Sequence, residues 1–325
     1  METRTESIKT IAELSGVRAH MLYRNYKQVS GFAQWDQLHH ATEYMIFAEN
    51  IGPNLSIDEV SLSKGELYTY VTNKAAKGRK GTLVASIRGT KAADIIDVLQ
   101  RLPLADRLKV SEVTLDMAKN MEAAVGHVFP NARLVTDRFH VMQLAYEVVQ
   151  RMRISLRWKE MDRENAAIAE ARELGVRYVP EQLVNGDTPK QLLTRSRYVL
   201  NKPESRWTNN QWLRAKLVFQ RYPELKQGYD HVQKLTTIYK MTDRDKATQA
   251  LERWIANARN MTSKWFESCA RTFENFITSI TGFFAQRSTN ASAESFNAKV
   301  KGFRALQRGV TDTEFFLFRL AKLYG

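Results

Sequence analysis

The segment Ser288-Thr-Asn-Ala-Ser-Ala-Glu-Ser-Phe-Asn-Ala-Lys-Val-Lys301, near the end of the chain, carries an unusual polar pattern. Four of its polar residues are spaced so that they share one face of a helix, with Ser288 or Thr289 as the predicted cap: Asn290, Glu294, Asn297 and Lys301. A carboxylate between amides and an ammonium suits a site that holds metal and phosphate. A solvated face with an intrahelical Glu–Lys arrangement is the alternative for the segment taken alone.

Size and composition describe an ordinary core-forming protein. The chain has 325 residues, 43% hydrophobic and 26% charged, enough for one large domain with an insertion or for two modest ones. No apolar run approaches the roughly 18 residues that span a membrane, and the sequence METRTESIKT lacks the apolar core of a signal peptide. The single cysteine, Cys269, excludes an internal disulfide and a multi-Cys zinc site. We therefore expect a cytoplasmic, nucleoid-associated protein.

The net charge of +14 is concentrated in the C-terminal half. Residues 1–144 hold 18 Lys and Arg against 16 Asp and Glu, residues 145–285 hold 24 against 16, and residues 286–325 hold 7 against 3. A surface that binds a polyanion requires such an excess, although basic proteins without nucleic-acid partners also exist.

Residues 1–50 are predicted to form an N-terminal helical region, with two short helices over 5–30 broken at Ser15-Gly16. The spacing of Ala12, Gly16, Val17 and Leu22 fits a partial helix-turn-helix, in which Arg18 begins the second helix and could contact DNA. A plain helical hairpin fits the same pattern.

From residue 51 the pattern turns to strands. Alternation predicts a hairpin, Leu55–Leu62 and Glu66–Thr72, joined by a turn at Ser63-Lys-Gly65. A third strand, two further strands and three helices are predicted in chain order: strand Gly81–Arg88, helix Lys91–Arg101, strand Lys109–Asp116, helix Met117–Phe129, strand Ala132–Asp137 and helix His140–Arg153.

This order is that of an α/β, ribonuclease H-like fold: a mixed five-stranded sheet flanked by helices, in which the first and fourth strands are neighbours. Residues 51–150 would form the first part of the catalytic core and residues 286–325 its completing helices. Residues 151–285 read as a large all-α insertion before the last catalytic helix, and hold five of the six tryptophans, most of which we expect in its core.

Three carboxylates stand at strand positions. Asp58 lies between apolar neighbours in a strand, where a charge is costly unless it is paired or bound to metal. Asp116 and Asp137 end strands directly before helices, where a capping role is the alternative. Two such aspartates with Glu294 would form an all-oxygen site suited to Mg²⁺ or Mn²⁺, and to two ions in phosphoryl transfer.

Together these motifs resemble the DDE-type transposases of bacterial insertion sequences, in the subgroup with a long helical insertion. The resemblance covers residues 50–325 and rests on Ile57-Asp-Glu, Leu115-Asp-Met-Ala, Phe129-Pro-Asn, Asp137-Arg-Phe-His140 and the segment from Asn290 to Lys301. It implies a catalytic, metal-binding triad of Asp58, Asp116 and Glu294. It further implies accessory roles for Asp137, His140, Asn290, Asn297 and Lys301.

The expected partner is double-stranded DNA, both element ends and target, bound by a homodimer or higher oligomer. Basic side chains expected to contact it are Arg18, Lys77, Arg79, Lys80, Arg304 and Arg308. The loop Lys74–Lys80 is itself predicted to be a solvated connection, with backbone contact as a secondary use. Family members typically begin with a zinc module, for which this chain has too few cysteines, so a separately encoded end-recognition protein or a fragment is implied.

The resemblance implies metal-dependent phosphodiester hydrolysis and strand transfer at the ends of a mobile element. A structure-selective nuclease or resolvase of the same fold would use similar residues without joining strands. A non-catalytic DNA-binding derivative of a transposase would bind DNA in a salt-sensitive way without either activity.

Overall fold

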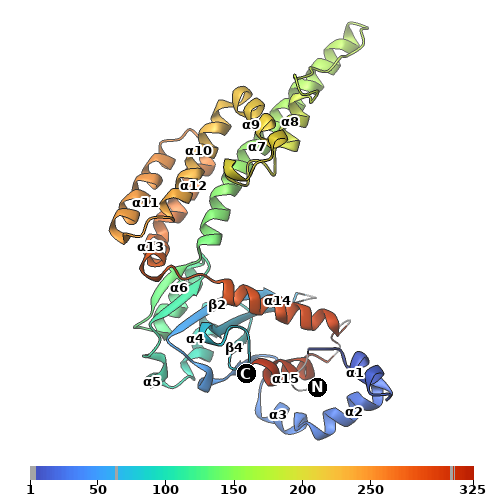
Figure 1. Ribbon diagram of the computed structural model, residues 1–325, viewed down its shortest axis with the longest axis vertical. Helices are drawn as coiled ribbons and strands as arrows, with labels where there is room; N and C mark the ends of the chain where they lie inside the picture. Colours follow the sequence, from blue (N-terminus) through green and yellow to red (C-terminus); the bar gives the residue numbers. More distant parts are fainter. Residues whose placement is uncertain (1–4, 63–64, 308–309, 311) are drawn as a thin grey trace. The chain divides into compact units, whose positions relative to one another are not determined.

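The computed structural model describes residues 5–62, 65–307, 310 and 312–325. The turn predicted at Ser63-Lys64 and the predicted DNA contact Arg308 lie outside these residues. The chain divides into two compact units, a first unit up to Asp137 that resumes at Gln286–Gly325, and a second unit, Arg138–Ala285 (Figure 1).

The first unit is built on a mixed sheet with the strand order β1-β4-β3-β2-β5-β6. Its strands are β1 (Tyr44–Ile46), β2 (Asn54–Ser61), β3 (Leu67–Asn73), β4 (Leu83–Arg88), β5 (Glu112–Leu115) and β6 (Arg133–Thr136). The predicted count of five strands is wrong, because the three-residue β1 adds an edge strand that pairs antiparallel with β4. Such a short strand leaves no alternation to detect in the sequence.

The pairing of β2 with β5 was predicted and is confirmed. The two strands run parallel and pair Asn54 with Glu112 and Ser56 with Thr114. Strand β6 continues the parallel part, pairing Leu115 with Thr136. The carboxyl ends of β2, β5 and β6 therefore lie at one edge of the sheet.

Apolar side chains cover the two faces of this sheet with different helices. On one face, α4 (Ala92–Gln100) and α6 (Lys119–Val128) pack on residues such as Ile57 and Val113. On the other, α14 (Ala291–Leu306) and α15 (Thr313–Tyr324) cover Val60 and Tyr70, with the Phe296 ring edge-on to Tyr70 at 5.5 Å (Figure 1). The short helices and 3-10 turns of this part are α5 (Leu104–Arg107), η1 (Ala48–Asn50) and η2 (Lys74–Ala76).

The N-terminal helices are α1 (Ile8–Leu14), α2 (Ala19–Val29) and α3 (Phe32–Leu38). The predicted break at Ser15-Gly16 is confirmed, and Gly16 adopts φ 66°, which a glycine reaches at low cost. Phe32 packs edge-on against Phe315 and Phe318, so these helices belong to the first unit.

The second unit is helical throughout its regular structure. Its helices are α7 (Arg138–Glu173), α8 (Pro189–Arg195), α9 (Asn209–Arg221), α10 (Pro223–Ile238), α11 (Arg244–Arg259), α12 (Lys264–Asn275) and α13 (Ile277–Gln286), with the 3-10 turn η3 (Glu204–Arg206). The last residue of α13 is assigned to the first unit. Helix α7 is much longer than the predicted His140–Arg153.

The expectation that most tryptophans of the second unit are core residues is wrong. Trp254 is buried, but Trp158 and Trp212 are about half exposed. Among the described residues, no helix is both long enough and apolar enough to cross a bilayer.

Candidate active site

Three aspartates lie at or near the carboxyl ends of the three parallel strands, at positions that the strand pairing relates to one another. The pairing of Ser56 with Thr114, extended by two residues, sets Asp58 opposite Asp116. The pairing of Leu115 with Thr136, extended by one, sets Asp116 opposite Asp137, whose N–H donates to Leu115 O at 3.1 Å. Neighbouring strands lie about 4.8 Å apart, so the backbone positions of the three residues form a row across the carboxyl end of the sheet.

Helix α14 lies over this row. The amide of Asn297 donates to Asp58 Oδ2 at 2.7 Å, and a carboxylate oxygen of Glu294 lies within 4.8 Å of one of Asp137. One turn of α14 thus lies close to Asp58 in β2 and to Asp137 just after β6, and Asp116 follows β5, the strand between these two. Of the four residues of the predicted polar face, Asn290 and Asn297 are buried, whereas Glu294 and Lys301 are exposed.

The start of α14 is unusual. The N-cap residue is Asn290, not the predicted Ser288 or Thr289, and its side chain makes no capping hydrogen bond. Asn290 is 0% exposed, and within the described residues neither atom of its amide group has a hydrogen-bond partner. Leaving a buried amide unsatisfied is costly, so this position favours a polar ligand close to Glu294.

Glu59 is a carboxylate of the site region that the sequence analysis did not single out. Burial and, secondarily, the nearby charge of Asp116 raise the pKa of Glu59. Side chains alternate along a strand, so Glu59 leaves β2 on the face opposite Asp58. Asp116 lies one residue beyond β5, where the strand no longer dictates the direction of its side chain, and its carboxylate interacts with Glu59.

A buried ionic cluster lies on the same face of the sheet as Asp58. Glu112, 1% exposed, accepts from Arg133 Nη2 at 2.8 Å and from Lys74 Nζ at 3.3 Å, and Lys74 also donates to the Thr114 hydroxyl. Burial opposes ionisation of Glu112, but hydrogen bonds from Arg133, Ser288 and Lys74 hold its pKa below the ordinary value. Burial lowers the pKa of Lys74, against the opposing influence of Glu112 and Asp137.

The loop Lys74–Lys80 is therefore only partly solvated, and the prediction is wrong for Lys74. The loop is also tied to α14, because Lys299 Nζ donates to Gly78 O at 2.8 Å. Lys77, Arg79 and Lys80 are exposed, as a DNA contact requires.

The other predicted DNA contacts differ in exposure. Arg18, at the N-cap of α2, and Lys301, on α14, are exposed. Arg304 is 8% exposed and donates to Glu66, and its guanidinium lies over the ring of Phe316 at 5.4 Å. This burial argues against the predicted DNA contact of Arg304. His140 is the third residue of α7, in the second unit, and its accessory role remains a prediction.

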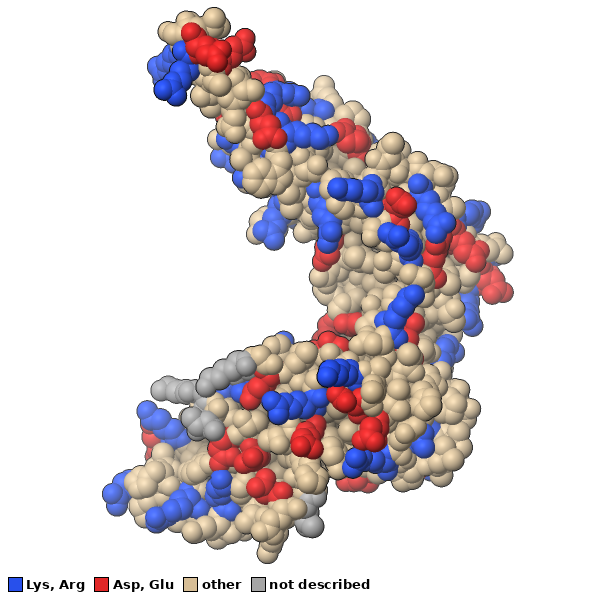
Figure 2. Space-filling view, turned by 180° about the vertical axis from the view of Figure 1, so that it is seen from behind, with Lys and Arg blue, Asp and Glu red and all other residues tan. Residues whose placement is uncertain are grey.

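Positive and negative side chains are intermingled on the face of the molecule shown in Figure 2. The net charge of +14 is therefore not gathered into a single patch on that face. The basic residues near the site are those of the loop between β3 and β4, which Lys299 connects to α14.

The donors at the sheet edge suit a hard divalent cation. Asp137 and Glu294 bring carboxylate oxygens within 4.8 Å of each other, and Asp58, which Asn297 contacts from the same helix, supplies another. Mg²⁺ and Mn²⁺ prefer such oxygen ligands. The residues present therefore fit the metal that the sequence predicts.

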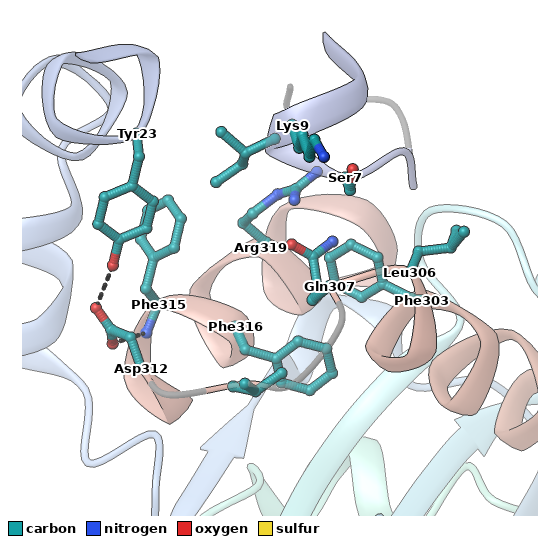
Figure 3. Close-up of a pocket in the computed structure, with 12 residues that line it drawn as sticks. Ser7, Lys9, Tyr23, Phe303, Leu306, Gln307, Asp312, Phe315, Phe316 and Arg319 are labelled. Carbon is teal, nitrogen blue, oxygen red and sulfur yellow. Dashed lines mark hydrogen bonds between the residues drawn. The ribbon is translucent and has the colours of Figure 1, made fainter. Parts of the chain in front are cut away.

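A separate pocket of about 310 Å³ lies between the N-terminal helices and the ends of α14 and α15 (Figure 3). There Tyr23 donates to Asp312 at 2.6 Å, and Phe303, Phe315 and Phe316 supply apolar walls. The described residues that line this pocket include none of the carboxylates above. It is not the site of the acidic row.

A family model for DDE transposases of the ISL3 type, described as a transposase, matches residues 55–320. A search of the curated proteins gives no match. The matched region spans most of the chain and runs from β2, which carries Asp58, through α14, which carries Glu294. The chain belongs to the ISL3 family of DDE transposases.

Proposed function

We propose that this transposase hydrolyses phosphodiester bonds at the ends of a mobile element and transfers the freed 3′-hydroxyl to target DNA. The metal ligands in this proposal are Asp58, Asp116 and Glu294. The observation that supports it is the position of α14, whose Asn297 bonds to Asp58 and whose Glu294 carboxylate lies within 4.8 Å of that of Asp137. This arrangement brings a helical carboxylate to strand-end carboxylates that lie far away in the sequence.

Each side chain has a distinct task in this reaction. Asp58, Asp116 and Glu294 would hold Mg²⁺ or Mn²⁺, two ions in the usual mechanism, and the metal would supply activation of the attacking water or 3′-hydroxyl group and stabilisation of the leaving oxygen. Asn297 holds Asp58 in orientation through the 2.7 Å hydrogen bond. Lys301, which is exposed, would meet non-bridging phosphate oxygens. Asp137, His140 and Asn290 keep the accessory roles that the resemblance implies.

The DNA-binding part of the proposal rests on exposed basic residues near the site. Lys77, Arg79 and Lys80 project from the loop that Lys299 ties to α14, and Arg18 begins α2. Contacts of these cations with phosphates would be sequence-independent and weakened by salt. We propose that a homodimer or higher oligomer assembles on DNA, with end recognition assisted by a separately encoded protein.

The first experiment compares two adjacent acids on β2. We expect Asp58→Asn to lower Mn²⁺-supported cleavage of an element-end duplex roughly 100-fold or more, the scale of losing one electrostatic stabiliser. Glu59→Gln tests the neighbouring acid, which leaves the strand on the other face and reaches the site only through the charge of Asp116, so it should retain more activity than Asp58→Asn. Cleavage by Asp58→Asn at the wild-type rate would remove Asp58 from the site.

The second experiment tests the remaining ligands and the class of reaction. Asp116→Asn and Glu294→Gln should abolish cleavage but keep DNA binding in a gel-shift assay, whereas Glu314→Gln on α15 should behave as wild type. Joining of a pre-cut 3′ end to plasmid DNA should depend on the same carboxylates. Cleavage without joining would indicate a nuclease or resolvase, and binding without either activity would indicate a non-catalytic derivative.

A further inference from the structure

Three arginines of the second unit, where α7 meets the end of α8, have no carboxylate partner within the part of the chain that the structure describes. They are Arg153 and Arg157, one turn apart on α7, and Arg197, just after α8. We call these three residues the arginine cluster. Acidic residues of the same region are already paired with other cations: Glu160 with Arg163, Glu164 with Lys190 and Asp187 with Arg195.

Neutral groups hold the most buried member of the arginine cluster. Arg153 is 6% exposed, and it donates through Nη1 to Leu193 O at 3.0 Å and through Nε to Gln150 Oε1 at 2.8 Å. Gln150 Nε2 in turn donates to Arg197 O at 3.1 Å, so one glutamine connects both elements. Because a backbone carbonyl and an amide carry no charge, these contacts satisfy the hydrogen bonds of Arg153 but leave its positive charge without a counter-ion.

The other two guanidinium groups are more accessible. Arg197 is exposed, and its guanidinium lies 5.6 Å from the ring centroid of Tyr198, which is itself 70% exposed. Arg157 is half-buried, and its Nε is buried with no hydrogen-bond partner among the described residues. Burial and, secondarily, the charges of Arg197 and Arg157 lower the pKa of Arg153, which agrees with three cations gathered without an anion.

We propose that the arginine cluster binds phosphate groups of the DNA backbone, as a DNA contact on the second unit. An external anion would compensate the buried charge of Arg153, while Arg157 and Arg197 offer the planar donor pairs that match phosphate oxygens. The segment 188–202, which includes Arg197, holds four Lys and Arg and no Asp or Glu. The inference rests on the proposed function, which makes DNA the substrate, and adds contacts outside the first unit.

The test measures binding of the full chain to a fluorescently labelled duplex of arbitrary sequence, by anisotropy in EDTA over a series of salt concentrations. Each lost phosphate contact should reduce the slope of log affinity against log salt by about 1. We expect this reduction for Arg197→Gln, which changes an exposed residue and should keep the wild-type melting temperature. The double variant Arg157→Gln with Arg197→Gln should lose about 2.

Two controls separate this site from a general effect of charge. Arg197→Lys keeps the positive charge and should keep the wild-type slope. Arg253→Gln removes an equal charge from an exposed position on α11, which packs on α10 and α12, and should also keep that slope. A wild-type slope in both Arg197→Gln and the double variant, or an equal reduction in Arg253→Gln, would overturn the site. Absence of salt-dependent DNA binding by the wild-type chain would instead overturn the proposed function on which it rests.

Discussion

At the residue scale, neighbouring acids in one strand have different surroundings. Asp58 accepts from Asn297 of α14, whereas the environment of Glu59 is set by burial and by Asp116. The sequence Ile57-Asp-Glu-Val60 shows both carboxylates, but alternation in a strand assigns them to opposite faces. Asp58 could be selected from the sequence because Ile57 and Val60 mark an apolar strand and because the motif Ile57-Asp-Glu resembles that of the transposase family. The interaction of Asp116 with Glu59 could not be predicted from the sequence, because Asp116 lies beyond the regular strand.

The surroundings of Lys74 could not be predicted from its neighbours in the sequence. Within the sequence it is one of several basic residues in a loop, and such runs are usually solvated. Its ammonium instead reaches Glu112, which lies 38 residues later in the chain. No local periodicity reports a contact of that range, because the contact depends on the order of strands in the sheet.

Burial of His231 predicts that the stability of the fold depends on pH through this one residue. It is 5% exposed and stacks on Trp254 at 4.4 Å, and burial together with Lys234 lowers the pKa of His231 to about 4. The ordinary histidine pKa is about 6.5, so between pH 6.5 and 4 the unfolded chain binds a proton that the folded chain does not. Stability is therefore fully present above pH 6.5 and is lost as pH falls towards 4.

We expect the melting temperature of the second unit, followed by calorimetry, to fall over this range in the wild type. His231→Phe keeps an aromatic ring against Trp254 and should flatten the pH dependence. His127→Gln, at an exposed histidine on α6, should leave it as in the wild type. An unchanged pH dependence in His231→Phe would show that another group is responsible.

At the scale of elements, α14 is the part that sequence reasoning described best. The spacing of Glu294 and Asn297 predicted one polar helical face; Asn297 contacts Asp58 of the sheet, and Glu294 lies near Asp137 but is exposed. The predicted cap was wrong, since Asn290 begins the helix and is buried. Capping propensity cannot anticipate a polar residue that tertiary packing removes from water. The edge strand β1 and the full length of α7 were missed for a similar reason, because neighbouring elements determine both.

The contact between α14 and β2 leads to a prediction for Asn297. Asn297→Ala removes the amide that holds Asp58, and should lower Mn²⁺-supported cleavage about 10–100-fold by disordering a ligand. DNA binding should change little, because no charge is lost. Lys299→Met, two residues along the same helix, removes the tie to Gly78 and serves as a control for general loosening of α14.

Single-turnover cleavage at several Mn²⁺ concentrations would measure this effect. The expected signature for Asn297→Ala is a higher Mn²⁺ requirement, which excess metal partly restores. A loss of cleavage in Lys299→Met equal to that in Asn297→Ala would assign the effect to the whole helix and not to the hydrogen bond with Asp58.

At the scale of the whole molecule, the two units differ in how the chain builds their cores. The second unit is one continuous segment of the chain, and its first and last helices both contact Tyr239. Tyr239 receives the Arg138 guanidinium at 5.3 Å and the rings of Phe283 and Phe284 at 5.2 and 5.6 Å. The first unit is discontinuous, since Phe296, Phe303 and Leu320 complete the core over Val60 and Tyr70. Its hydrophobic core therefore requires residues from both sides of the second unit.

This difference predicts the behaviour of fragments. Residues 138–285 alone should fold, because burial of residues such as Leu235, Trp254 and Phe273 is internal to that segment. We expect a helical circular dichroism spectrum and a cooperative thermal transition. Residues 1–137 alone should lack such a transition, since one face of the sheet would lose α14 and α15 and expose its apolar side chains to water. A cooperative melt for residues 1–137, or a disordered spectrum for residues 138–285, would contradict this division of the cores.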